Sequence, residues 1–124
     1  MKRHFLLISR ADSVATSLVG AAMRAGDDLA TVQDTNEAIR LVRLKSPDAV
    51  LCALDPSDTE AVIICRRLRR YSRAPIVMLI SNKSVDTVLR GYRLGADAHI
   101  PIPCDLREFS ARFRALLRRS PVPA

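Results

Sequence analysis

The sequence predicts a doubly wound α/β domain, with five parallel strands in one sheet and helices on both of its faces. Short apolar runs alternate along the chain with segments whose apolar residues recur at helical spacing. The connections between these segments are short, and parallel strands joined in this way require right-handed helical crossovers. The length of 124 residues fits one domain of ordinary size.

The five expected strands are apolar runs bounded by polar or turn-forming residues. Continuous runs of this kind are typical of strands that helices cover on both faces. The clearest run is Ile-Val-Met-Leu-Ile after Pro75, and the second run is the weakest. The expected strands span residues 5–8, 29–32, 49–54, 76–80 and 98–102.

Capping residues and apolar stripes predict the helices between these strands. Asp12 can cap a first helix that runs to Ala25, where Gly26 would end it. Asp34 and Glu37 have capping-box spacing ahead of a second helix, which should stop before a Ser-Pro pair.

The three remaining helices follow from the same signals. Apolar residues at helical spacing from Ala61 to Leu68 predict a third helix, and a fourth is expected to end near Gly95. Asp105 and Glu108 form another capping box, which introduces the last helix.

Composition narrows the class of protein. We expect one domain over residues 1–119 and a linker or tail over residues 120–124. No apolar run approaches the ~18 residues that a membrane span needs. The three cysteines are odd in number, far apart and without a CxxC or Cys/His pairing, so we expect no metal site and a cytoplasmic location. We expect no cofactor either. An enzyme is not expected, because no nucleophile–base pair or phosphate-binding glycine loop is visible.

Charge is distributed unevenly along the chain. Residues 1–62 carry 7 lysines and arginines against 9 acidic residues, whereas residues 63–124 carry 13 against 4. Such a basic half can attract nucleic acid or an acidic partner, or it can simply be a solvated face. Neither a helix-turn-helix pattern nor an aromatic stacking platform is visible, so direct DNA binding is not required.

Several motifs between residues 47 and 119 resemble the receiver domain of response regulators. They are Pro47-Asp48-Ala-Val-Leu-Cys, Cys65-Arg-Arg-Leu-Arg, Pro75-Ile-Val-Met-Leu, Gly95-Ala-Asp97, Pro103 and Arg112-Phe-Arg-Ala-Leu-Leu-Arg-Arg119. The resemblance covers nearly the whole chain and implies the (βα)5 flavodoxin-like receiver fold. It also implies a cis peptide bond before Pro103.

The same resemblance implies a phosphorylation pocket, but the residues that carry out phosphorylation in receivers are all replaced in this chain. Ser9 and Arg10 occupy the places where receivers carry two acidic metal-binding residues. Ala53 occupies the place of the phosphoacceptor aspartate. Ile80 and Ile102 replace the switch Thr/Ser and the lysine of the family.

We therefore expect aspartate phosphorylation to be lost, because it needs a carboxylate nucleophile, Mg²⁺ and a neutralising cation. His99 takes the aromatic switch position, and Ser81 follows the fourth strand at the pocket. A shifted phosphorylation site at Asp55, with Asp12 as a second carboxylate, is the alternative. Arg10 either pairs with one of these two acids in place of a metal or points into solvent.

The last helix resembles the end of receivers that precede a winged-helix DNA-binding domain. We expect a phosphorylation-independent interaction domain of a transcriptional regulator, which reaches DNA only indirectly or weakly. By resemblance, the fourth helix, fifth strand and last helix would form a homodimer face. Candidate charge partners on that face are Arg90, Arg93, Asp97, Arg112 and Arg119. Two alternatives stay open: a standalone nucleic-acid-binding protein that uses the basic half, and a small-ligand sensor that uses the altered pocket.

Overall fold

The structure is a computed structural model that describes residues 2–10, 12–81 and 84–119. Five strands and five helices alternate within this part of the chain. They are β1 (Arg3–Ile8), α1 (Ser13–Ala21), β2 (Asp27–Val32), α2 (Thr35–Lys45), β3 (Ala49–Cys52), α3 (Thr59–Tyr71), β4 (Ile76–Ile80), α4 (Val85–Arg93), β5 (Ala98–Pro101) and α5 (Leu106–Arg119). The predicted linker or tail over residues 120–124 lies outside the described residues.

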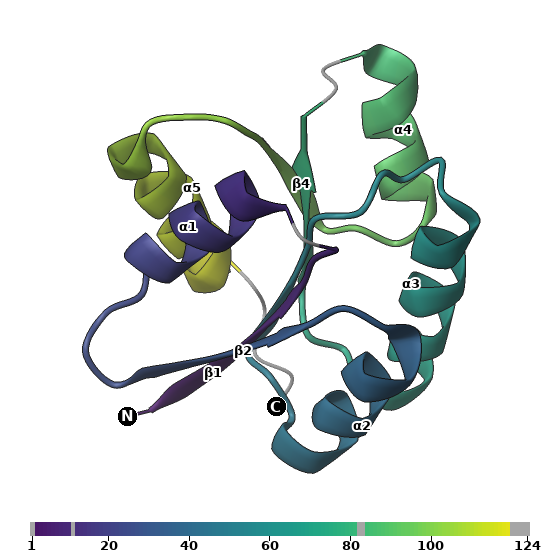
Figure 1. Ribbon diagram of the computed structural model, residues 1–124, viewed down its shortest axis with the longest axis horizontal. Coiled ribbons are helices and arrows are strands. Elements are labelled where there is room, and N and C mark those ends of the chain that lie inside the picture. Colours follow the sequence, from purple (N-terminus) through teal and green to yellow (C-terminus); the bar gives the residue numbers. More distant parts are fainter. Residues whose placement is uncertain (1, 11, 82–83, 120–124) are drawn as a thin grey trace.

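The strands form one parallel sheet in the order β2-β1-β3-β4-β5. Helices α1 and α5 cover one face of the sheet, and α2 and α3 cover the other, with α4 on the same side as α3 (Figure 1). This arrangement confirms the predicted doubly wound fold. The strand order switches direction between β1 and β3, which is where such sheets open a crevice at their carboxyl ends. Among the described helices, none is long and apolar enough to cross a membrane.

Two hydrophobic clusters hold the helices against the sheet. Leu6 and Ile8 of β1 join the cluster under α2 and α3, whereas Phe5 and Leu7 join the cluster under α1 and α5. All four side chains are buried. Burial on both faces explains why the strands appear in the sequence as continuous apolar runs.

The predicted caps begin the helices as expected. The Asp12 carboxylate accepts a hydrogen bond from the Ala15 N–H at 3.1 Å, and the Asp34 carboxylate accepts one from the Glu37 N–H at 2.8 Å. Each bond satisfies an N–H group that the first turn of a helix leaves unpaired.

The predicted end of the first helix at Ala25 is wrong, because α1 already ends at Ala21. The carbonyl group of the next residue accepts a hydrogen bond from Arg114 at 3.0 Å. The Asp27 carboxylate accepts another from the Arg24 N–H at 2.8 Å. These two bonds stabilise a turn between α1 and β2 in place of further helix.

Some strand bounds also differ from the prediction. β3 ends at Cys52, two residues early, and β5 ends at Pro101, one residue early. The N–H groups of Ala53 and Ile102 still donate to the neighbouring strands, to the carbonyl groups of residues 8 and 80, at 2.8 and 3.0 Å. The differences therefore concern the last hydrogen bonds of each ladder and not the path of the chain.

Candidate functional site

The candidate site is a small cavity at the carboxyl ends of β3 and β4, beside the start of α1. Its volume is about 50 Å³. The lining residues are Asp12, Ala53, Leu54, Asp55, Pro56, Leu79, Ile80, Ser81 and Thr87. Because pockets for small organic ligands usually measure roughly 300–1,000 Å³, this cavity has room for little more than water or an ion.

Four of the residues predicted for the pocket line this cavity: Ala53, Asp55, Ile80 and Ser81. Among the other lining residues, Pro56, Leu79 and Thr87 were not predicted. Thr87 lies in the first turn of α4. The sequence alone does not show how this helix is oriented against the end of β4, so Thr87 could not be placed at the cavity. Asp12, which was considered as a second carboxylate, also lines the cavity.

Ser9 and Ile102 lie near the cavity without lining it, and both are buried. The Ser9 hydroxyl accepts a hydrogen bond from the Asp12 N–H at 3.3 Å, so it helps to shape the start of α1. Ile102 belongs to the cluster under α1 and α5. The bond between Ile102 and Pro103 is cis, as the resemblance implied.

Arg10 forms an ion pair with Glu60, in the first turn of α3. The expected pairing of Arg10 with Asp55 or Asp12 is therefore wrong. The Arg10 side chain is 48% exposed, so the pair lies at the surface of the site. Glu60 was missed because an acid at this position is favourable at any helix N-terminus and carries no signal of a distant partner.

Asp55 holds its own loop in place. Its Oδ1 accepts hydrogen bonds from the Ser57 N–H at 2.9 Å and from the Ser57 hydroxyl at 2.7 Å. These two hydrogen bonds lower the pKa of Asp55, partial burial opposes them, and the charge of Arg90 adds to the lowering. The carboxylate therefore stays ionised and acts as the acceptor of a tight turn.

The side chains of this site do not fit the Mg²⁺ ion that the receiver resemblance implies. Mg²⁺ prefers carboxylate and water oxygens in near-octahedral geometry. The two positions where receivers carry metal-binding acids hold the Ser9 hydroxyl and the Arg10 guanidinium group. The nearby carboxylates of Asp12 and Asp55 are already engaged in a helix cap and a turn. Within the described ranges, no three His, Cys, Asp or Glu side chains are grouped as a metal site requires.

His99, at the switch position, contacts Tyr92 of α4. The Tyr92 hydroxyl and His99 Nδ1 are 3.0 Å apart, and the two rings meet edge to face with centroids 5.7 Å apart. This pair connects α4 directly to β5. Tyr92 was not predicted as a partner of His99, because the two residues are seven positions apart and lie on different elements, α4 and β5.

The candidate dimer face combines exposed arginines with charged side chains that already have partners within the chain. Arg90 and Arg93 are exposed on α4. Asp97 is already bound within the chain, since its carboxylate accepts from Arg69 at 2.8 Å and from the Ile76 N–H at 2.7 Å. Arg112 forms an ion pair with the residue one turn earlier, Glu108, at 3.0 Å, and the side chain of Arg119 lies outside what the structure describes.

The helices α4 and α5 also expose large apolar side chains that were not predicted as part of the dimer face. They are Val85, Leu89, Tyr92 and Leu106. They come from α4 and the start of α5, which flank β5.

Comparisons with known proteins identify curated relatives over nearly the whole chain. No family model matches the chain. The transcriptional regulatory protein AfsQ1 of Streptomyces coelicolor is 33% identical over 115 residues, which are 92% of this chain and 51% of that protein. The DNA-binding response regulator MtrA of Mycolicibacterium smegmatis is 34% identical over 120 residues, which are 97% of this chain and 53% of that protein. The chain thus spans about half the length of these curated relatives.

Solved structures agree on the fold. The crystal structure of a two-component response regulator from Clostridium difficile matches 98% of this chain and 100% of its own, with a TM-score of 0.82 and 21% identity. At this identity the likeness shows the fold, and the curated relatives share the sequence of the same domain. The chain therefore belongs to the receiver domain family of response regulators.

Proposed function

We propose that this chain is a pseudo-receiver, a phosphorylation-independent interaction domain that regulates a transcriptional regulator. The main supporting observation is the Arg10–Glu60 ion pair, because Arg10 is a cation at a position where receivers carry a metal-binding acid. Ala53 supports the same proposal, because a methyl group cannot accept a phosphoryl group. In this proposal the domain is not an enzyme and acts in the cytoplasm.

The proposal also includes a homodimer through α4, β5 and α5. An exposed apolar cluster flanked by charged residues is typical of a protein contact surface. Leu89 and Tyr92 would form the centre of this surface, and Arg90 and Arg93 its rim. Because the relatives are about twice as long as the chain and one is named as DNA-binding, we propose that DNA is reached through an attached effector domain.

Phosphorylation is tested by recording amide NMR spectra with Mg²⁺ and beryllofluoride, and by intact mass after treatment with a small-molecule phosphodonor. We expect no shifts at the cavity residues and no gain of mass. The matched control is the double variant Arg10→Asp with Ala53→Asp, which restores two carboxylates and should show Mg²⁺-dependent shifts. Saturable shifts around Asp55 in the unmodified chain, or a phosphoryl group mapped to it, would contradict the proposal.

The dimer is tested separately by analytical ultracentrifugation. We expect dimers of the unmodified chain without any phosphoryl mimic. Leu89→Glu should give monomers, because it places a charge at the centre of the apolar surface. Val14→Glu is the control, since Val14 is equally exposed on α1, outside this surface. A monomer at high micromolar concentration would count against the dimer while leaving the phosphorylation test unaffected.

A further inference from the structure

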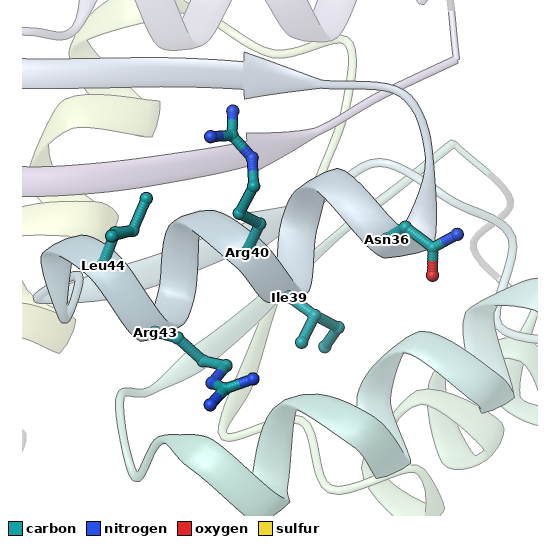
Figure 2. A pocket seen from close by; sticks show the side chains of 5 residues that line it. All are labelled: Asn36, Ile39, Arg40, Arg43 and Leu44. Carbon is teal, nitrogen blue, oxygen red and sulfur yellow. The ribbon is translucent and has the colours of Figure 1, made fainter.

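The outer side of α2 carries a stripe of residues that the proposed function does not use. They recur at intervals of three and four, so they lie along one side of the helix, and they line an open hollow of about 600 Å³. They are Asn36, Ile39, Arg40, Arg43 and Leu44, which we call the α2 stripe. Figure 2 shows that this side is broad: Ile39 and Arg43 lie along its edge toward α3, and Arg40 and Leu44 lie along its other edge.

The α2 stripe combines an apolar floor with an unusually exposed leucine. Ile39 is only 5% exposed and connects the stripe to the core, but Leu44 leaves 68% of its surface exposed. Tyr71, at the end of α3, is another large side chain that is half exposed near the stripe. Packing a second helix on this surface would remove apolar area from water, which is the main driving force of association.

The stripe is also positively charged, because it carries Arg40 and Arg43. In the part that the structure describes, no carboxylate forms an ion pair with Arg40 or Arg43. Arg43 lies over the ring of Tyr71, with 4.9 Å between its guanidinium carbon and the ring centroid. Arg67 of α3 donates a hydrogen bond to the Asn36 side chain at 3.3 Å.

These contacts hold part of the surface in shape before any partner arrives. A side chain that is already positioned loses less conformational freedom on binding. Three more exposed arginines, Arg66, Arg70 and Arg73, extend the positive charge along and beyond α3. The complementary partner is therefore acidic.

The shape of the stripe favours a helix over a nucleic acid. Residues spaced three and four apart form the ridge that one helix presents to another. From residue 36 to 44 the stripe extends over about 12 Å, which matches two turns of a partner helix. A protruding leucine beside two arginines suits an apolar partner side chain better than a phosphate backbone, which binds through cations and polar groups.

We propose that the α2 stripe docks an acidic amphipathic helix of a partner protein. Apolar residues of the partner cover Leu44, and its carboxylates pair with Arg40 and Arg43. This surface is separate from the dimer face on α4, β5 and α5, so the inference goes beyond the proposed function.

The test measures the fluorescence anisotropy of a labelled 16-residue peptide mixed with the whole chain. The peptide places leucines at helical spacing with glutamates beside them, and a second peptide has the same composition in scrambled order. Arg40→Glu with Arg43→Glu should weaken binding of the ordered peptide by about tenfold or more, because each like charge repels the partner. Leu44→Ala should weaken it severalfold, whereas Leu89→Ala, on the dimer face, should not.

The matched charge control is Arg24→Glu with Arg107→Glu, which alters net charge equally at exposed arginines outside the stripe. An equal loss of affinity in this control, or equal binding of the scrambled peptide, would show that nonspecific charge attraction explains the binding and would overturn the proposal. No binding at about 1 mM, or a duplex DNA that binds the stripe and displaces the peptide, would overturn it as well. Melting curves of the variants establish that each remains folded.

Discussion

Two arginine–carboxylate pairs in this domain have opposite environments. Arg114 of α5 and Asp27 of β2 are bound at 2.6 Å with side chains only 6% and 8% exposed. In the Arg10–Glu60 pair the side chains are 48% and 26% exposed. Water weakens the attraction between the charges of the exposed pair, and it can hydrogen-bond either group if the partner is removed. We therefore expect the buried pair to contribute more to stability than the exposed pair.

The buried pair holds the fold together. Besides Asp27, Arg114 binds the carbonyl group of Ala22 and lies against the rings of Phe5 and Phe113, with guanidinium-to-centroid distances of 5.7 and 5.3 Å. It thereby connects α5 to the turn between α1 and β2. The exposed pair instead joins the loop after β1 to the first turn of α3 at the surface of the domain.

The largest expected effect comes from removing the buried cation. Arg114→Ala leaves the Asp27 carboxylate buried without its partner and opens space beside two aromatic rings, so we expect a loss of about 3–5 kcal/mol in the free energy of unfolding. Urea denaturation measures this loss. Arg112→Ala is the control two residues earlier, where the exposed pair with Glu108 contributes at most about 0.5 kcal/mol. A similar loss in both variants would contradict the distinction between the pairs.

The second largest expected effect is the weakening of the buried pair by acid. Partial burial favours the neutral form of Asp27, but hydrogen bonds from the Arg24 N–H and from Arg114 outweigh it and lower the pKa below 3.8. Since the pKa is lower in the folded state, the ionised carboxylate stabilises the fold above the unfolded value, and this contribution is lost as the pH falls through the folded value.

The measurement compares unfolding of the unmodified chain and of Asp27→Asn between pH 7 and pH 2.5. The difference in stability between them should stay constant at neutral pH and shrink below about pH 4. Glu108→Gln, on the exposed face of α5, is the control and should show little such change. A difference that does not vary with pH would mean that the Asp27 charge does not stabilise the fold.

Local patterns in the sequence were enough to predict most of the fold. The apolar run from Ile76 to Ile80 matches β4 at both ends, and Asp34 caps α2 as its spacing indicates. The end of α1 could not be predicted, because it depends on Arg114, which lies 92 residues away from the carbonyl group that it binds. Nothing in the sequence around Arg114 indicates that its side chain is buried.

The candidate site was predictable in position but not in its contacts. Parallel strands bring their carboxyl ends together, so Ala53 and Ile80 could be placed at one cavity from the strand pattern alone. The spacing of Asp55 and Ser57 is typical of a side-chain-closed turn and could have indicated that the carboxylate is engaged. The partner of Arg10 depends instead on the direction in which α3 leaves its loop, which no local pattern specifies.

Removing the exposed pair should have the smallest effect on stability. Arg10→Ala leaves Glu60 in contact with water, so we expect the free energy of unfolding to change by less than about 1 kcal/mol. Raising the salt concentration should reduce even this difference, because ions screen exposed charges. Thermal and urea unfolding at low and high salt provide the measurement, with Arg24→Ala as a control at an exposed arginine that forms no ion pair within the described chain. A loss near that of Arg114→Ala would show that the exposed pair stabilises the fold as much as the buried pair does, and it would contradict the distinction between the two pairs.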